Sequence, residues 1–558
     1  MTSQYESIVI NTLREANIPV VSIDERFFPE ERWLIVYVPQ ESLTAAQSLA
    51  GQIEQILNSD HKRDGAQFSV TFRPSRPSGE AEVEQAKIGR LSRRDVDQLI
   101  QLLEARSRTS DALPSLGYVK DPRGNLAAVG ASRHQLIYGR RGVGKTALLV
   151  ESKRLAERDG HITVWINAQV MQGFNPNEAF LFLAERILDS ILKTVGSSGS
   201  ASFVGLQSSR DEIRKLRREG GVANRNIYHL VADLNTALRS VLRRDLLQLI
   251  VYIDDFYFYP SATQPRLLDL SAGLLRDCNG WLKLASIERL TRPYEPSSRI
   301  GLEIPHDATK IDLDVTLEDP TAAQSFLETV LSHYTATAGL QSPASIAKME
   351  ARGRLVLASG GVPRDYLNLF GDSIVVAREN RPQAREIGKE DVAAAAGRSS
   401  RSKKRDLDLD VSSEESATLL DAISRVSDSI KGVGFTYFRV NSAEKMLAGY
   451  EILSRLVDMR FIHLIQSTLS DKHSPGMKYE AYVLALSEYT ETRLRRGLQV
   501  LDLETGRWTH RQSGKAHTVQ QLVGTQLRDR LRKAPLIDLR KLERDGPQNV
   551  LASKIADH

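Results

Sequence analysis

Apolar residues between positions 134 and 287 alternate between short strand-like runs and longer stretches with helical spacing. A helix is predicted from Thr146 and another over 176–194, and residues 320–396 continue as helices. Strands that alternate with helices are typical of a parallel sheet flanked by helices, so this pattern predicts an α/β core followed by a helical region. The strand-like runs are HQLIYG from 134, ITVWIN at 162–167, LLQLIVYID at 246–254 and WLKLASI at 281–287.

Residues 1–73 predict a separate small α+β module with the order helix, strand, strand, helix, strand. The stretch RPSRPSG over 73–79 carries two prolines and no apolar residue, which indicates a linker and a domain boundary near 73–80. A helical linker is expected over 80–115. The predicted elements of the module are a helix carrying Tyr5, Ile8 and Leu13, strands at Pro19–Ile23 and Trp33–Val38, a helix over Leu43–Leu57, and a strand at Gln67–Phe72.

Composition places the chain among ordinary soluble globular proteins. It has 558 residues, of which 41% are hydrophobic and 26% are charged. The single cysteine, Cys278, excludes a disulfide framework, an all-cysteine zinc site and a Cys-x-x-Cys redox pair, which fits a reducing cytosol. The first residues do not resemble a signal peptide, and no apolar run approaches the roughly 20 residues of a membrane span, so we expect a cytoplasmic protein without membrane contact.

Charge is distributed unevenly along the chain. Residues 1–72 contain 5 Lys and Arg against 10 Asp and Glu, a net charge of −5, and the overall charge of +5 leaves +10 for the rest. This basic balance permits nucleic-acid binding without requiring it.

Residues 139–146, GRRGVGKT, match the phosphate-binding pattern G-x-x-x-x-G-K-[ST]. The match follows an apolar strand and precedes a helix-compatible run, which is the structural context that the motif needs. Backbone N–H groups of such a loop point at a phosphate, and the helix N-terminus adds partial positive charge. Lys145 is expected to reach the β- and γ-phosphates and Thr146 to help hold Mg²⁺. The predicted nucleotide contacts are Gly139, Gly142, Val143, Gly144, Lys145, Thr146 and Ala147.

A second ligand for the metal, a carboxylate, is predicted at the end of LLQLIVYIDD. Asp254 ends this apolar strand and is the expected Mg²⁺-side acid, and Asp255 follows where a general base would polarise the attacking water. The alternative is an acidic turn after a core strand.

This pairing and its order resemble the AAA+ ATPases, and later landmarks favour the origin-recognition and initiator-like branch, with further similarity to bacterial transposition ATPases. The resemblance implies ATP and Mg²⁺ as cofactors. Ser286, at the end of WLKLASI, resembles sensor 1, or is simply a buried serine. Residues 360–364, GGVPR, resemble the G-x-P-R signature of the helical lid, which implies that Pro363 lies at the nucleotide and that Arg364 touches the γ-phosphate as sensor 2. The alternative is a helix-opening turn with a solvated arginine.

AAA+ proteins usually complete the site with an arginine from a neighbouring subunit, because hydrolysis spreads charge over the γ-oxygens. Arg299 is the best-placed candidate, and Arg289 and Arg292 compete with it. The family therefore implies a homo-oligomer.

Two features depart from the AAA+ pattern. Most of these hydrolases have Glu where this chain has Asp255, so the base is retracted by about one methylene and slow turnover is expected. An Asp-Asp pair also occurs in signal-transduction (STAND-type) ATPases, in which nucleotide acts chiefly as a switch. The cluster Phe256–Tyr259 is also unusual, and we interpret it as packing under the nucleotide or at a subunit contact, with base stacking as the lesser alternative.

The region after the lid is similar to a winged helix, which initiator-type AAA+ proteins carry at this place. Ser412–Lys431 and 448–458 predict helices, and FIHLIQS, LSDKHSPGMK and YEAYVLAL predict a hairpin with a polar loop. In that interpretation Arg455 lies on the third helix, and Lys472, His473 and Lys478 line the wing and meet DNA phosphates. The alternative is that this domain binds protein or packs on the lid.

Two basic tracts have open interpretations. Arg210–Arg218 is a solvated helix face, or a nucleic-acid or partner contact. GRSSRSKKR at 397–405 is a solvated linker, or a phosphate contact beside a DNA-binding domain.

The predicted architecture is α/β, a P-loop AAA+ core with a helical lid, a winged-helix-like C-terminal domain and a small α+β N-terminal domain. The predicted domains are 1–73, 80–115, the core at 116–318, the lid at 319–396, a basic linker at 397–411, the winged-helix-like domain at 412–495 and a helical tail at 496–558.

Two functions are weighed. The first is a cytosolic AAA+ ATPase that assembles on double-stranded DNA and regulates a protein partner in DNA maintenance, transposition or antiviral defence. The second is a STAND-like signalling switch that recognises a protein trigger, with little turnover. A small-molecule P-loop kinase is disfavoured, since the lid and the C-terminal module have no role there.

Overall fold

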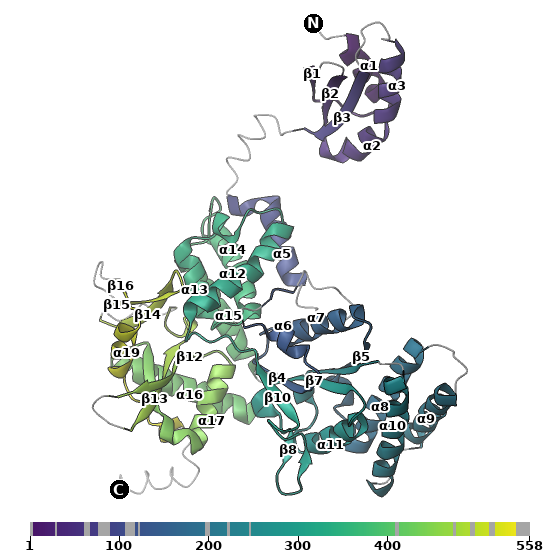
Figure 1. Ribbon diagram of the computed structural model, residues 1–558. Helices are drawn as coiled ribbons and strands as arrows, with labels where there is room; N and C mark the ends of the chain where they lie inside the picture. Colours follow the sequence, from purple (N-terminus) through teal and green to yellow (C-terminus); the bar gives the residue numbers. More distant parts are fainter. Residues whose placement is uncertain are drawn as a thin grey trace. The chain divides into compact units, whose positions relative to one another are not determined.

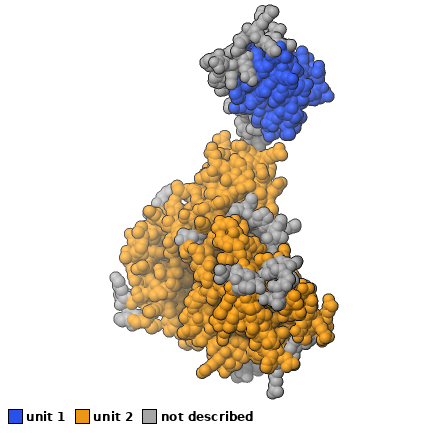
Figure 2. All heavy atoms as spheres, turned by 45° about the vertical axis from the view of Figure 1, so that its right-hand side comes forward, with its two compact units in different colours: residues 1–89 blue, residues 90–558 orange. Residues whose placement is uncertain are grey.

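The structure is a computed structural model. The chain divides into two compact units, residues 1–89 and 90–558 (Figure 2). The structure describes residues 4–27, 31–60, 67–75, 90–105, 118–120, 123–195, 201–219, 224–244, 247–407, 412–471, 476–490, 497–512 and 519–542.

The first unit is the predicted α+β domain. Strand β2 lies in the middle of a three-stranded sheet, antiparallel to β1 and parallel to β3. Alternate residues of β2, such as Leu34 and Val36, are buried in one core with Val9 and Ile53 from the helices. The first strand begins at Ser22 rather than Pro19. The elements are α1(Gln4–Glu15), β1(Ser22–Phe27), β2(Glu31–Val38), α2(Leu43–Ser48), α3(Ala50–Asp60) and β3(Gln67–Pro74).

The centre of the second unit is a five-stranded parallel sheet of order β10-β4-β7-β6-β5 (Figure 1). This is the predicted α/β core of the AAA+ P-loop fold. Its strands are β4(His134–Tyr138), β5(Ile162–Asn167), β6(Leu249–Asp254), β7(Gly280–Ser286) and β10(Ala308–Asp312).

Both faces of this sheet are buried, which explains why its strands read as nearly continuous apolar runs. On β6, Ile250 and Tyr252 pack with one set of helices, and Val251 and Ile253 pack with the other. The first set is α6(Asn125–Val129) and α7(Lys145–Arg158), and the second includes α8(Pro176–Val195), α9(Ala201–Arg218), α10(Asn224–Arg244) and α11(Gln264–Leu275). A short hairpin, β8(Tyr294–Glu295) and β9(Ile300–Gly301), lies between β7 and β10 in sequence.

The lid consists of helices, as the sequence predicts. Helix α5 packs against it through Val96, Leu99 and Leu103. The helices are α5(Arg94–Ala105), α12(Pro320–Thr337), α13(Met349–Ser359), α14(Pro363–Asn380) and α15(Lys389–Arg405).

The expected basic linker after the lid is wrong for residues 397–405, because α15 continues to Arg405. Alanines and buried small residues hold its first half in the lid, and its last turn is tied to the next domain. There Lys404 pairs with Glu488 at 2.8 Å and Lys403 donates to the carbonyl of Met459. Residues 408–411 lie outside the described part of the chain.

The next domain, predicted to be winged-helix-like, has the order helix, strand, helix and hairpin. Its sheet has the order β11-β13-β12, all antiparallel. The elements are α16(Ser413–Gly432), β11(Tyr437–Asn441), α17(Ala448–Asp458), β12(Ile462–Ser470), β13(Lys478–Leu484) and α18(Ser487–Thr490).

The expected helical tail from 496 is wrong in its first half, where a three-stranded antiparallel sheet forms. Its first two strands meet at a tight turn in which Thr505 and Gly506 both have positive φ. This sheet packs on lid helix α13, where Arg354 forms a buried ion pair with Asp502 at 2.7 Å. The elements are β14(Gln499–Glu504), β15(Arg507–Gln512), β16(Gln520–Gln521) and α19(Thr525–Arg532).

Among the described helices, none is both long and apolar enough to cross a membrane.

Candidate nucleotide-binding site

The P-loop joins β4 to α7 at the carboxyl edge of the parallel sheet. Gly142 and Gly144 have φ of 88° and 105°, a conformation that residues with a Cβ rarely adopt. Space is also restricted, because a Cβ on Gly142 would lie 2.7 Å from the Cβ of Arg364. Helix α7 begins at Lys145, so its free N–H groups lie at the loop, as an anion site requires.

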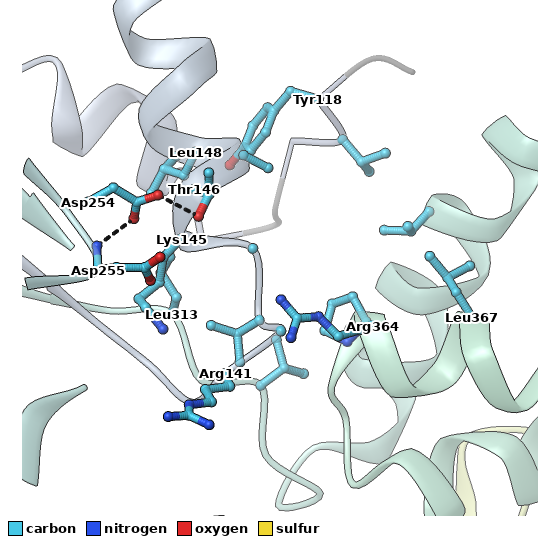
Figure 3. A pocket seen from close by; sticks show the side chains of 18 of the residues that line it. Tyr118, Arg141, Lys145, Thr146, Leu148, Asp254, Asp255, Leu313, Arg364 and Leu367 are labelled. Atoms are coloured by element: carbon cyan, nitrogen blue, oxygen red, sulfur yellow. Dashed lines mark hydrogen bonds between the residues drawn. The ribbon is translucent and has the colours of Figure 1, made fainter. Parts of the chain in front are cut away.

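Lys145 is buried beneath the loop that it follows (Figure 3). Its Nζ donates to the carbonyl oxygens of Gly139 at 2.7 Å and Arg140 at 3.1 Å. Burial lowers the pKa of Lys145 to about 8, and the carboxylates of Asp255, Asp314 and Asp254 oppose this shift. An anionic phosphate at the loop would add to this opposition and favour the charged ammonium.

Two adjacent acids lie beside the first turn of α7. Thr146 Oγ1 donates to Asp254 Oδ2 at 2.8 Å, and the backbone N–H of Asp255 donates to Asp254 Oδ1 at 3.0 Å. Burial, and then the Asp255 carboxylate, raises the pKa of Asp254 to about 6. A divalent cation would relieve this repulsion, so the charge state of the pair fits a metal site.

The donor set fits Mg²⁺. Thr146 and Asp254 supply a hydroxyl and a carboxylate, the hard oxygen ligands that Mg²⁺ takes together with water and phosphate oxygens. No group of three or more His, Cys, Asp or Glu that could hold a metal by itself occurs among the described residues.

Asp255 has a left-handed backbone with φ of 53°. Aspartate is one of the few residues with a Cβ that tolerate this region, because its short side chain bonds locally, and glutamate does so less well. Asn167, at the end of the neighbouring strand β5, donates to Asp255 Oδ2 at 3.5 Å. An aspartate at this position therefore suits the local backbone conformation.

A cavity of about 620 Å³ opens beside these groups. It brings together most of the predicted site, from the P-loop, from β6 and from the start of α14. The predicted residues that line it are Gly142, Val143, Gly144, Lys145, Thr146, Ala147, Asp254, Asp255, Pro363 and Arg364. Gly139 contributes its carbonyl to Lys145.

Sequence reasoning missed the remainder of the cavity wall. Many of these residues come from the segment before β4 and from lid helices α12 and α14, and others, such as Asn167 and Gln169, lie at the end of β5 and just after it. No motif spacing joins them. The helical spacing of the lid residues predicts that they share a helix face, but that face could equally well pack in the core of the lid. The missed residues include Tyr118, Arg123, Phe326, Val330, His333, Tyr334, Leu367 and Asn368.

The lid contacts the P-loop directly. The backbone N–H of Arg364 donates to the carbonyl of Gly142 at 3.2 Å. Arg140 binds Asp314 Oδ1 through its backbone N–H and Nε, and its Nη2 donates to the carbonyls of Val315 and Gly360. These contacts tie the P-loop to the lid.

The other predicted arginines and the sensor serine lie away from the described cavity wall. Ser286 ends β7 between the P-loop strand and β6, where it is buried and shares a hydrogen bond of 2.6 Å with Thr291. Arg299 is exposed on the hairpin between β8 and β9. Arg289 pairs with Asp458 of the winged-helix-like domain, and Arg292 pairs with Glu295. The roles of Ser286 and Arg299 stay predictions.

The aromatic cluster after the acids divides in two. Phe256 and Tyr259 are fully buried in the core beneath the sheet edge. Tyr257 and Phe258 line the cavity, and the guanidinium of Arg141 lies 5.4 Å from the Tyr257 ring centroid. Packing of this cluster under a nucleotide or at a subunit contact stays a prediction.

The winged-helix-like domain is docked on the nucleotide site through the turn between α17 and β12. Arg460 forms an ion pair with Asp365, beside Arg364, at 2.7 Å, and its Nη1 donates to the carbonyl of P-loop residue Arg141 at 3.2 Å. His463 lies against Gly360, where a glycine Cβ would come within 2.4 Å of its ring. One domain therefore touches both the P-loop and the lid.

Of the predicted DNA contacts of this domain, one is held by ion pairs, one is exposed, and two lie outside the described residues, so their role stays a prediction. Arg455 on α17 pairs with Glu415 and Glu451, and the C-terminal η10 helix (Leu539–Leu542) packs on α17 at Gly449. Lys478 is exposed, and Lys472 and His473 lie outside the described residues.

The tract Arg210–Arg218 also forms intramolecular contacts. Arg214 pairs with Glu185 and Asp189 of helix α8, and Arg217 pairs with Glu185. These pairs favour the interpretation as a helix face.

Comparison with known proteins finds no matching family model and no matching curated protein. Solved structures do match. Cdc6p from Pyrobaculum aerophilum has 16% identity over 73% of this chain and 96% of its own, with a TM-score of 0.29. The RuvB Holliday junction branch migration motor from Thermotoga maritima has 13% identity over 63% of this chain and 94% of its own, with a TM-score of 0.30. At these values, neither likeness assigns an activity to this chain.

Proposed function

We propose that the chain binds ATP with Mg²⁺ in this cavity and hydrolyses it slowly. The observation that carries the proposal is the contact of 2.8 Å between the Thr146 hydroxyl and Asp254, at the start of a helix that follows a glycine loop. Hydroxyl, carboxylate, buried lysine and free helix N–H groups together supply what a Mg²⁺-bound polyphosphate needs.

Each residue has a distinct role in this proposal. Lys145 and the loop N–H groups bind the β- and γ-phosphates, and Thr146 and Asp254 hold the metal. Asp255, oriented by Asn167, accepts a proton from the attacking water. Arg364, on the lid side of the cavity, is proposed to stabilise charge on the γ-phosphate.

Isothermal titration of the full chain with ATP and Mg²⁺ tests binding. We expect Lys145→Ala to lower the affinity at least tenfold, whereas Lys153→Ala, further along the same helix and not among the residues that line the cavity, leaves it unchanged. Asp255→Asn is expected to bind ATP and lose most of its hydrolysis, by roughly 10²-fold or more if Asp255 is the base. Equal affinity in Lys145→Ala and the wild type would overturn the proposal.

A second candidate is a nucleotide-controlled switch, which the docking of Arg460 on the P-loop and lid favours. Nucleotide that moves the P-loop would change this docking, and the docking would change nucleotide affinity by the same factor. Hydrogen exchange of residues 458–465 with and without ATP tests the switch. Equal exchange in both states would contradict it.

Action on DNA, as a homo-oligomer with Arg299 supplied in trans and a protein effector as partner, is a further proposal. The winged-helix-like order, the exposed position of Arg299 and the net charge of +10 after residue 72 support it. Duplex DNA is expected to stimulate hydrolysis, and Arg299→Ala to abolish that stimulation while the wild-type sedimentation behaviour is kept. No effect of DNA on turnover would count against this role and favour the switch.

A further inference from the structure

The cavity has two chemically different ends. Lys145, Thr146 and the two acids line the phosphate end. The opposite end is lined by half-buried apolar side chains of the lid helices and of the segment before β4. Figure 3 shows Tyr118 on the core side and Leu367 on the lid side of this space. A nucleotide bound by its phosphates at the P-loop would have its base at the apolar end.

The apolar end is built from a regular stripe of one helix. Phe326, Val330 and Tyr334 are four residues apart along α12, so they share a face of that helix, and all three line the cavity while only half buried. Apolar side chains left half exposed in a concave wall gain stability when a flat aromatic ligand covers them. The stripe therefore suits a nucleobase.

Helix α14 connects the two ends. Its first turn lies at the P-loop, because the Arg364 N–H donates to Gly142, and Arg364 lines the cavity there. Asn368 is one helical turn further along, on the same face, and it too lines the cavity. Its neighbour Leu367 is buried whereas Asn368 is exposed. Side chains one turn apart on a helix are separated by about 5–6 Å. Asn368 is therefore placed further from the phosphate end than Arg364, toward the expected position of the nucleoside.

An asparagine amide offers a hydrogen-bond acceptor and a donor side by side. The N7 edge of adenine offers the complementary acceptor and amino donor, whereas guanine presents two acceptors, N7 and O6. With guanine, the carbonyl oxygen of the amide would face O6, which is also an acceptor, and no hydrogen bond could form between them. His333 also lines the cavity, but its ring directs only one nitrogen at a time to a ligand edge.

We propose that Asn368 is a specificity-determining residue that selects adenine over guanine at the apolar end of this cavity. The inference rests on the proposed nucleotide-binding function and adds the residue that reads the base. The paired contact is made only with the adenine edge, so its loss lowers affinity for ATP and leaves affinity for GTP nearly unchanged.

The test compares the dissociation constants of ATP and GTP for full-length wild type, Asn368→Leu, Asn368→Gln and the control Asn380→Leu. Asn380 is the exposed last residue of the same helix and does not line the cavity. We expect the wild type to prefer ATP by about tenfold or more, the scale of one bidentate base contact. Asn368→Leu should lose most of this preference, Asn368→Gln should recover part of it, and Asn380→Leu should keep it.

An unchanged ATP to GTP ratio in Asn368→Leu, or equal binding of both nucleotides by the wild type, would overturn this inference while leaving a nucleotide site in place. Failure of the proposed function looks different, because then the wild type and Lys145→Ala would bind both nucleotides equally weakly.

Discussion

Replacing Arg460 by methionine tests the link between the winged-helix-like domain and the nucleotide site. Methionine keeps most of the length of the side chain and removes its charge and donors. The substitution breaks the ion pair with Asp365 and the hydrogen bond to the carbonyl of Arg141. The first contact holds the lid helix and the second holds the P-loop.

The magnitude follows from burial. Both side chains of the ion pair are only 16% exposed. Breaking an exposed ion pair costs up to about 1 kcal/mol, and breaking a buried pair costs about 3–5 kcal/mol. The cost of breaking this pair should lie between these values. A hydrogen bond from a charged donor contributes about 1.5 kcal/mol. If that bond alone is coupled to nucleotide, release accelerates by about tenfold.

The assay is stopped-flow release of a fluorescent ATP analogue from Arg460→Met, Asp365→Asn and the double variant. Arg425→Met is the matched control, because Arg425 lies in the same domain and pairs with Asp421 within its own helix at 2.9 Å. We expect release to accelerate about 3- to 10-fold in Arg460→Met, with a non-additive double variant. Release within twofold of the wild type, or an equal change in Arg425→Met, would refute the coupling.

Three further predictions concern pH and packing. Burial lowers the pKa of His463 to about 3, below its unfolded value near 6.5, so the stability of the fold falls as pH drops through this window, by up to about 1.4 kcal/mol per pH unit. His463→Leu should make the melting temperature less dependent on pH between pH 7 and 4. An equal pH dependence in the wild type and the variant would contradict this. Because the pKa of Asp254 is raised to about 6, affinity for Mg²⁺-ATP should fall up to tenfold per pH unit below that value, and calorimetry of Asp255→Asn should show the decline at lower pH. A Cβ on Gly449 would lie 2.0 Å from the carbonyl oxygen of Leu539. Gly449→Ala should therefore lower the free energy of unfolding by about 1–3 kcal/mol and speed hydrogen exchange over 535–542. The control Gly432→Ala, which has open space around the added Cβ, should change neither quantity.

Elements with a strong local signal were predicted well. The strand before the P-loop and the strand that ends at Asp254 are both rich in apolar residues, and both form within the predicted segments. The tract at 397–405 was misassigned because its charges suggested a linker, although Lys403 and Lys404 are held by contacts to distant residues. Such contacts leave no local pattern.

The sequence by itself determined the phosphate end of the site. A glycine loop, a lysine and an apolar strand ending in acids are each local requirements, set by backbone freedom, phosphate charge and a buried sheet. The tertiary structure alone decided the apolar end of the cavity, where Tyr118, Phe326 and Asn368 come from three separate segments of the chain. It also decided that Arg460 reaches the P-loop, a contact between residues 319 positions apart. Long-range contacts of this kind depend on how helices pack, and packing is a property of the whole folded chain.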